Sequence, residues 1–394
     1  MKLTGYRRTD GRIGCRNHIL VIPTVQCANR VVELIGEQVP EAVGVPHVWG
    51  CTFGVADNHV IERTLVGFGS HPNVYATLLV SLGCETISGE QVAARIAATG
   101  KPVELLTIQE CGGTAKTTER GLEIARRWAA EAAAVEREAF GAEELIVALE
   151  CGGSDAFSGL SANPAVGAAS DRLVETGGTV ILSETTEIIG AEHLLAERCV
   201  DAAVRKDLLD AVASAEMRFA TASREASGIY ITPGNIEGGL TTIAEKSLGC
   251  IHKAGNSPVQ EVLTYGRRPS RRGLVVMDTP GYDVSSITGM VAGGAQLTFF
   301  TTGRGSPTGC PIAPVVKVCS NSDTFGRLAD NMDVNAGAVI DGNATLEEVG
   351  KAIFDEACAV VNGKRTKSEE YGHREFAIAA PSVYYCRLEA NELG

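Results

Sequence analysis

The stretch 150–195, ECGGSDAFSGLSANPAVGAASDRLVETGGTVILSETTEIIGAEHLL, decides the fold. An apolar run at 145–149 precedes it and predicts a buried strand, and a second apolar run at 180–182 lies within it. Residues 165–175 between the two runs have helical spacing, and two glycines follow them. This order predicts a parallel βαβ unit, whose two strands end at the same edge of the sheet. Ligands bind at that edge in open parallel sheets.

Polar side chains follow both of these predicted strands. After the first strand come Cys151, Ser154 and Asp155, and after the second come Ser183, Glu184, Glu187, Glu192 and His193. Acidic residues also favour the first turn of a surface helix, and a single histidine is most often a satisfied structural residue. The alternative is a site for a divalent metal or for acid–base chemistry. Both interpretations remain open at this point.

The same alternation of strand and helix runs along most of the chain. We expect further strands at 18–25, 74–82, 103–108, 274–277 and 297–301, and helices at 28–37, 92–98, 122–137 and 345–362. Residues 46–59 are expected to form a glycine-punctuated loop, and 196–226 to form charged surface helices. The sequence therefore predicts an α/β protein of two or three domains, built on mainly parallel, glycine-rich β-α-β units. A polar hinge at 138–144 places the predicted boundary between domains at 1–140 and 141–394.

Charge and composition exclude several classes of partner. The net charge of −13 argues against nucleic acid, and no apolar run is long enough to span a membrane. The start of the chain has no export signal, so its 12 cysteines are expected to be cytoplasmic thiols. An anionic substrate would then need local cations, and the candidates in or beside glycine-rich loops are Arg16, Lys246, Arg304 and Lys317.

The glycine-rich loops and the cysteines each have two interpretations. No G-x-G-x-x-G motif opens a helix after a strand, so the glycines are expected to serve turns rather than nucleotide phosphates. Cysteines 27, 51, 84, 111, 151 and 310 lie beside a glycine or after a predicted strand. They are either small buried apolar residues or thiolate ligands for iron or an iron–sulfur cluster, although the close spacing of ferredoxin motifs is absent.

Eight motifs, in order along nearly the entire chain, resemble the altronate/galactarate dehydratase family. They are GYRRTDGRIGCRNH, SLGCE, ECGGSDAFSGLSANPAVGAASDRLV, GGTVILSETTEIIGAEHLL, GNIEGGLTTIAEKSLG, MDTPGYD, TTGRGSPTGCPIAPVVK and GKRTKSEEYG. The resemblance implies a dehydratase that converts sugar acids to 2-keto-3-deoxy acids with ferrous or manganous ion.

The resemblance also implies roles for individual residues. Glu184 and Asp155 are expected to bind the metal, with Cys151 or Cys310 as thiolate contacts. His193, Lys246 and Glu187 are the expected catalytic residues, with His193 as general base or acid. The residues expected to hold the anionic substrate are Arg304, Lys317, Ser154, Asn235 and Arg16.

Two features separate the chain from the common family pattern. Members usually carry a small N-terminal domain of the SAF type, whereas this sequence starts at the second domain. We therefore expect either a separate small SAF-type subunit or a site that is incomplete alone, and an oligomeric assembly. GNIEGGLTTIAEKSLG and YGHREF also resemble the large subunit of sulfolactate sulfo-lyase, so sulfite elimination is an alternative reaction. A further alternative is a non-catalytic binding or scaffold subunit.

Overall fold

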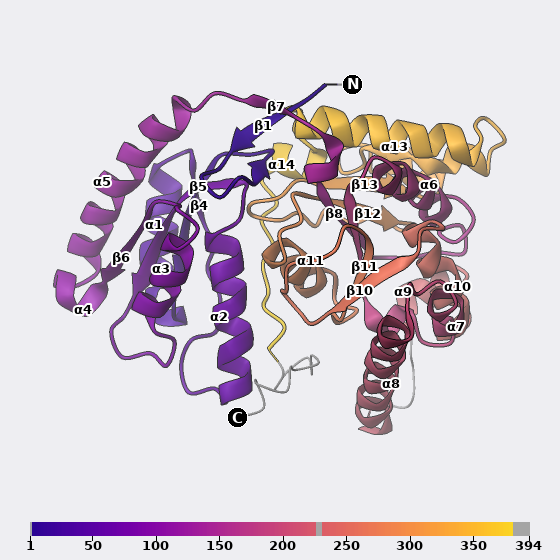
Figure 1. Cartoon of the computed structure of the whole chain (residues 1–394), viewed down its shortest axis with the longest axis horizontal. Helices are drawn as coiled ribbons and strands as arrows, with labels where there is room; N and C mark the ends of the chain where they lie inside the picture. Colours follow the sequence, from indigo (N-terminus) through magenta and orange to yellow (C-terminus); the bar gives the residue numbers. More distant parts are fainter. Residues whose placement is uncertain (1, 226–230, 381–394) are drawn as a thin grey trace.

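The computed structural model describes residues 2–225 and 231–380, with only the backbone described for 219–225. Two predictions extend beyond the described residues. The predicted surface helices end at residue 226, and the predicted second domain includes residues 381–394, and the structure describes neither of these parts. The predicted α/β architecture is confirmed, because two parallel sheets with helices on both faces make up most of the molecule (Figure 1).

The amino-terminal sheet has four parallel strands in the order β4-β3-β5-β6. These strands are β3 (His18–Pro23), β4 (Ala42–Gly44), β5 (Val74–Ser81) and β6 (Val103–Thr107). Successive residues of a strand point to opposite faces, so β3 supplies Ile19 and Val21 to one core and Leu20 and Ile22 to the other. Helices α1 (Asn29–Gln38) and α5 (Thr114–Ala133) cover the first face, and α2 (Val55–Gly69) and α3 (Gly89–Ala97) cover the second.

The larger sheet has seven parallel strands in the order β10-β11-β9-β8-β12-β13-β14. Their bounds are β8 (Ile146–Cys151), β9 (Thr179–Leu182), β10 (Val259–Leu263), β11 (Gly273–Met277), β12 (Leu297–Thr302), β13 (Val315–Cys319) and β14 (Val334–Asn335). Helices α6 (Ala162–Glu175) and α13 (Leu346–Val361) pack on one face, and α11 (Asp283–Ala292) packs on the other. The βαβ unit that the sequence predicted from residues 145–182 is therefore confirmed, and it is β8-α6-β9 at the centre of the sheet.

Three short helices and one long helix surround the carboxyl edge of the seven-stranded sheet. They are α7 (Glu192–Ala196), α8 (Ala202–Glu225), α9 (Pro233–Glu237) and α10 (Ile243–Cys250). Two more short helices, α12 (Ser322–Arg327) and α14 (Lys367–Glu370), lie near β13. Among the described residues, no helix combines the length and the apolar character needed to cross a bilayer.

A small antiparallel sheet, which the sequence did not predict, lies next to the predicted hinge. It has the order β2-β1-β7 and consists of β1 (Leu3–Arg7), β2 (Ile13–Gly14) and β7 (Glu138–Phe140). β7 therefore returns to the first strand of the chain before β8 begins the larger sheet. The domain boundary near residue 140 stays a prediction.

Two predicted elements differ in extent from those in the structure. The expected loop at 46–59 ends at Val55, where α2 begins after Gly54, and the Asp57 carboxylate accepts the Gly54 amide at 3.3 Å. The helix expected from residue 122 begins at Thr114. Both helices start at a glycine N-cap, which gives a weaker sequence signal than serine or aspartate.

Candidate active site

Three neighbouring strands deliver acidic and thiol side chains to the carboxyl edge of the seven-stranded sheet. β8 ends on Glu150 and Cys151, β9 is followed by Glu184 and Glu187, and β11 is followed by a loop that reaches Asp283. β9 lies between β8 and β11, so the three strand ends are adjacent. This is the edge at which the sequence predicted a site.

Cys151, Glu184, Glu187 and Cys250 form a buried group that we call the thiol–carboxylate cluster. Their ligand atoms lie within 4.8 Å of one another. The Cys151 thiol donates to Glu187 Oε2 at 2.9 Å and lies 3.8 Å from the Cys250 sulfur. The Cys151 amide donates to Glu184 Oε2 at 3.0 Å. Such a set of sulfur and oxygen donors could bind a metal ion.

Two lysines neutralise the carboxylates of this cluster. Lys253, which is completely buried, donates to Glu184 Oε2 at 2.9 Å. Lys246, on α10, donates to Glu187 Oε1. Burial opposes the charge on Lys246, but Glu187, Cys151 and Glu184 outweigh burial and raise its pKa. Burial likewise opposes the charge on Glu187, but Lys246 and Lys253 lower its pKa. We therefore describe Glu187 as a carboxylate and Lys246 as an ammonium group at neutral pH.

A second group of ligand atoms shares Glu184 with the thiol–carboxylate cluster. The carboxylates of Glu150, Glu184 and Asp283 lie within 4.8 Å of one another. Burial, followed by the charges of Glu184 and Glu187, raises the pKa of Asp283 to about 7. Burial and the neighbouring Glu184 and Asp283 also raise the pKa of Glu150. Of these three crowded carboxylates only Glu184 has a lysine partner, Lys253, so the group favours binding of a further cation, either protons or a metal ion.

Two carboxylate oxygens in this group have no hydrogen-bond partner among the described residues. They are Oε1 of Glu150 and Oε1 of Glu184, and both are buried. An unpaired buried oxygen is costly, whereas a divalent cation prefers such a ligand. The residues present therefore fit a bound divalent metal.

The backbone at Glu184 adopts a conformation that is rare for a residue with a side chain. Its φ is 61° and its ψ is 63°, in the left-handed region. The Glu184 amide donates to Thr279 Oγ1 at 2.7 Å, and the Thr185 amide donates to the Thr279 carbonyl at 3.2 Å. This strained turn directs Glu184 toward both ligand groups and is held in place by the loop after β11.

Gly152 is required for the close approach of two loops at the site. A Cβ atom at this position would lie 2.0 Å from Oδ2 of Asp283 and 2.7 Å from the Phe300 ring. Any larger residue at 152 would therefore displace the Asp283 carboxylate from its neighbours.

Asp155 lies outside the thiol–carboxylate cluster, although the sequence predicted it as a metal ligand. Its Oδ1 accepts from Ser158 and from Ser320, each hydroxyl at 2.8 Å, and its Oδ2 accepts from Asn321 Nδ2 at 2.9 Å. A Cβ at Gly303 would lie 2.1 Å from the Asp155 carboxyl carbon. Asp155 thus binds the loops after β8, β12 and β13 together.

Three of the residues predicted to bind the substrate, Ser154, Asn235 and Arg304, lie together at the loop that follows β8. Asn235 Nδ2 donates to the Ser154 carbonyl at 3.0 Å. Arg304 approaches the same segment, because a Cβ at Gly153 would lie 3.6 Å from its Cβ. The Arg304 guanidinium is partly exposed and pairs with Glu237 at 2.9 Å. The buried Ser154 hydroxyl has no hydrogen-bond partner among the described residues.

His193 does not join these groups. Its side chain is exposed on α7, whereas the cluster residues are buried. Its predicted role as general base or acid is not supported by this placement.

The remaining predicted residues are likewise separate from the thiol–carboxylate cluster. Lys317 is buried, donates to the Thr308 carbonyl and lies 5.0 Å from the centre of the Phe300 ring. Burial raises the pKa of the Cys310 thiol to about 12. Arg16 donates to both carboxylate oxygens of Glu369, at 2.7 and 2.8 Å. Cys310 and Arg16 line a cavity of about 400 Å³, together with residues such as His18, Arg137 and His373.

Sequence reasoning assigned no role to Glu150, Cys250, Lys253 or Asp283. One signal could have found two of them, because Lys246, Cys250 and Lys253 are spaced four and three residues apart. Such spacing places side chains on one face of a helix. Glu150 gave no such signal, since it continues an apolar strand and is completely buried.

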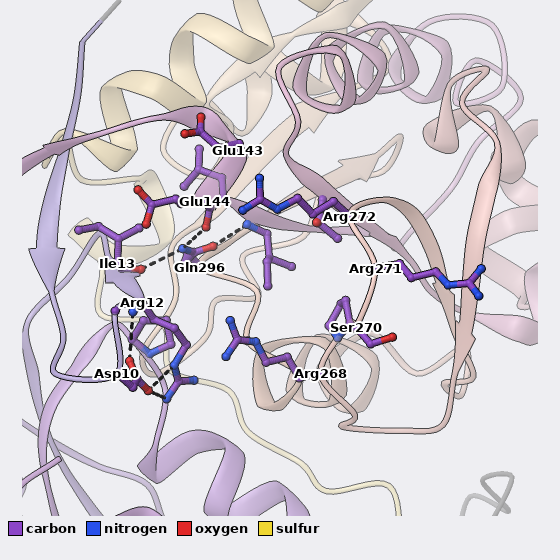
Figure 2. Close-up of a pocket in the computed structure, with 17 residues that line it drawn as sticks. Asp10, Arg12, Ile13, Glu143, Glu144, Arg268, Ser270, Arg271, Arg272 and Gln296 are labelled. Carbon is purple, nitrogen blue, oxygen red and sulfur yellow. Dashed lines mark hydrogen bonds and ion pairs between the residues drawn. The ribbon is translucent and has the colours of Figure 1, made fainter. Parts of the chain in front are cut away.

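A cavity of about 420 Å³ lies at the opposite, amino-terminal edge of the same sheet (Figure 2). It is lined by Arg12, Arg268 and Arg272 among others. Gln296 also lines this cavity, and its side-chain amide donates to the carbonyls of Ile13 at 2.9 Å and Glu144 at 3.1 Å, as Figure 2 shows. None of the predicted site residues lines this cavity.

Comparison with known proteins identifies the family. A model described as D-galactarate/altronate dehydratase, C-terminal, matches residues 142–384, and one described as D-galactarate dehydratase/altronate hydrolase, second domain, matches 5–133. The chain is 37% identical to (2R)-sulfolactate sulfo-lyase subunit beta of Chromohalobacter salexigens, covering 95% of this chain and 96% of that protein. It is also 37% identical to the Escherichia coli galactarate dehydratase (L-threo-forming) and 35% identical to the E. coli altronate dehydratase. Each of these matches covers 96% of this chain, and they cover 76% and 77% of the two dehydratases. The chain therefore belongs to the D-galactarate/altronate dehydratase family.

Proposed function

We propose that the protein is a hydro-lyase that removes water from a sugar acid with hydroxyl groups on carbons 2 and 3, giving a 2-keto-3-deoxy acid. The observation that carries this proposal is the thiol–carboxylate cluster with its two lysines, which lies at the ligand-binding edge of a parallel sheet. Three relatives named as dehydratases support the same class of reaction.

The proposed cofactor is a divalent metal, Fe²⁺ or Mn²⁺. Cys151, Glu184 and Cys250 are the residues proposed to hold it, and the unpaired Oε1 of Glu184 supports this choice. Thiolates suit iron, and carboxylates suit either ion. When bound, the ion would act as a Lewis acid toward the substrate carboxylate and 2-hydroxyl group.

Glu187 and Lys246 are proposed to move the protons. The Glu187 carboxylate takes the proton from carbon 2, and the Lys246 ammonium gives a proton to the departing 3-hydroxyl group, which leaves as water. Glu187 is then protonated and Lys246 neutral. Because Lys246 donates a hydrogen bond to Glu187, the proton can return directly between them and restore both groups. The enol product tautomerises to the 2-keto acid.

Arg304 is proposed to hold a carboxylate of the substrate. It is the predicted cation that reaches solvent beside the glycine-rich loop of Ser154, and its partner Glu237 is exposed. Exposed ion pairs are weak, so a substrate carboxylate can replace Glu237 at modest cost. The Ser154 hydroxyl and the Asn235 amide shape the same loop.

Sulfite elimination from a 2-hydroxy sulfonate is the second candidate function. It also begins with proton removal at carbon 2 and loses a group from carbon 3, so the same residues could serve it. The specific observation in its favour is the match over 96% of a sulfo-lyase subunit beta. That name also supports a further subunit as a partner of this chain, and we propose that this partner is the small SAF-type subunit.

An assay of both products separates the two functions. Anaerobically purified protein, with Fe²⁺ or Mn²⁺ added, is incubated with altronate, with galactarate and with sulfolactate, alone and with a small SAF-type subunit. Formation of a 2-keto-3-deoxy acid is expected from a sugar acid. Release of sulfite from sulfolactate, with no keto acid from either sugar acid, would replace the dehydratase by the sulfo-lyase. Inactivity on all three substrates together with no bound metal would favour a binding subunit.

A further inference from the structure

Every strand of the amino-terminal sheet is followed by a cysteine at its carboxyl edge. Cys27 follows β3, Cys51 follows β4, Cys84 follows β5 and Cys111 ends the short helix α4 (Ile108–Cys111) after β6. The order β4-β3-β5-β6 makes the first three of these strands immediate neighbours. Three thiols therefore emerge side by side along the edge where parallel sheets bind ligands.

The loops that carry Cys27, Cys51 and Cys84 touch one another. The Gln26 amide donates to the Trp49 carbonyl at 2.9 Å, and the Thr86 amide donates to the Gly50 carbonyl at 3.1 Å. A Cβ at Gly50 would lie 2.6 Å from the Cα of Val25. The Cys51 loop is thus packed against both of the other loops, within two residues of each of their cysteines.

These three thiols are exposed, which is unusual for free cysteine. Cys27, Cys51 and Cys84 are all exposed, whereas Cys15, Cys151, Cys250, Cys310, Cys319 and Cys358 are buried. A free cysteine without a chemical role is commonly buried as a small apolar residue, and exposed thiols are prone to oxidation. The sequence-based interpretation of these three residues as buried apolar side chains is therefore wrong.

A single metal ion and a polynuclear cluster require different distances between their sulfur ligands. In a tetrahedral zinc site with bonds of about 2.3 Å, the sulfurs lie about 3.8 Å apart. The three thiols are absent from the groups of described residues whose ligand atoms all lie within 4.8 Å of one another. An iron–sulfur cluster accepts a wider separation, because each cysteine binds a different iron atom.

We propose that Cys27, Cys51 and Cys84 hold an iron–sulfur cluster at the carboxyl edge of the amino-terminal sheet. Each thiol loses its proton when its sulfur binds iron. Gly50 and Thr52, with φ of 112° and 59°, bracket Cys51 in left-handed backbone that turns this loop out of the sheet. For Thr52 this conformation is strained, as is common at functional sites.

Cys111 is excluded from the proposed ligand set. It follows the edge strand β6, and its sulfur accepts from Arg120 Nη1 of α5 at 3.4 Å. Three protein thiolates leave one iron of a four-iron cluster open to a ligand from solution. The proposed site involves neither Cys151 nor Cys250, and it is independent of the function proposed for the thiol–carboxylate cluster.

Anaerobic reconstitution with ferrous iron and sulfide tests this site. Iron, acid-labile sulfide, visible absorption and the electron paramagnetic resonance spectrum after reduction are measured on the full chain. The wild-type protein is expected to bind sulfide, to bind an equal amount of iron in addition to any iron held by the thiol–carboxylate cluster, and to show a cluster spectrum. The C27S, C51S and C84S variants are each expected to lose more than half of the bound sulfide, and the triple variant to lose all of it.

Matched controls keep the result specific. Cys111→Ser and Cys199→Ser are expected to retain the full sulfide content, and Glu184→Gln is expected to retain the cluster spectrum. Circular dichroism melting of each apoprotein establishes that it is folded. The proposal is overturned if the folded wild-type protein binds no sulfide, if it binds one metal ion per chain without sulfide, or if Cys111→Ser loses as much cluster as Cys51→Ser.

Discussion

Lys253 Nζ lies 2.9 Å from Glu184 Oε2, and neither side chain has any exposed surface. Both charges are therefore removed from water and depend on each other. Glu184 belongs to both groups of possible metal ligands. This ion pair therefore holds in place the side chain that the two groups share.

Removing Lys253 is expected to destabilise the fold strongly. Lys253→Met leaves the Glu184 carboxylate buried and unpaired, which costs about 3–5 kcal/mol for a broken buried pair. Urea unfolding of the metal-free protein measures this loss. In Lys253→Met combined with Glu184→Gln, most of the loss should be recovered, because the second change removes the orphaned charge. A loss below about 1 kcal/mol in the single variant would show that the pair is not sealed from solvent.

Removing either proposed proton carrier is expected to reduce turnover without unfolding the protein. Glu187→Gln and Lys246→Met should each lower kcat by about 10²–10⁴-fold, the usual contribution of a general acid or base. Steady-state kinetics and thermal melts of the metal-loaded variants check this. His193→Gln is the matched control, and it should retain most of the activity because His193 is exposed on α7. A hundredfold loss in His193→Gln would instead assign the proton transfer to His193.

Asp155 is expected to support the fold rather than the metal. Asp155→Asn removes a charged acceptor that serves Ser158, Ser320 and Asn321, so the free energy of unfolding should fall by about 1–3 kcal/mol. The bound metal, measured at a temperature where the variant is folded, should remain unchanged. Loss of the metal at unchanged stability would restore Asp155 as a ligand.

Lys317 is expected to make stability depend on alkaline pH. Burial lowers its pKa from 10.5 to about 8, so between pH 8 and 10.5 the unfolded chain binds the proton and the folded chain does not. Stability therefore rises with pH in this window, and the cost of burying the charge, about 3 kcal/mol at most, applies in full below pH 8. Urea unfolding at pH 7.5, 9 and 10.5 should show this rise in the wild-type protein but not in Lys317→Met. The exposed Lys351→Met is the control and should keep the wild-type slope.

Much of the fold follows from periodicity that is visible in the sequence. The alternation of apolar runs with helical segments predicted β3, β5, β6, β8, β9, β11 and β12 at nearly their observed positions. β10 and β13 were not predicted, because β10 has partly exposed positions and β13 follows a long proline-containing loop with Lys317 inside it. The antiparallel pairing of β1 with β7 joins residues more than 130 positions apart, which local patterns do not report.

The candidate site was predicted only in part for the same physical reason. Glu184, Glu187 and Cys151 could be grouped because they directly follow neighbouring strands of one βαβ unit. Asp155 has the same position after a strand, but its carboxylate turns toward Ser320 and Asn321, and only tertiary structure reveals this. Cys250, at the end of α10, and Lys253, in the 3-10 turn that follows it, reach the cluster from about 100 residues away from Cys151 in sequence.

Elemental analysis of anaerobically purified protein, compared with Glu184→Gln, tests the metal site most directly. Glu192→Gln, from the same sequence motif but outside the thiol–carboxylate cluster, is the control. All three proteins also carry the triple substitution C27S/C51S/C84S, so that iron bound at the proposed iron–sulfur site does not contribute. We expect about one Fe²⁺ or Mn²⁺ per chain in the parent and the control and a loss of most of it in Glu184→Gln. Equal metal content in Glu184→Gln and its parent, or no metal in a folded parent, would contradict a metal centre at Glu184.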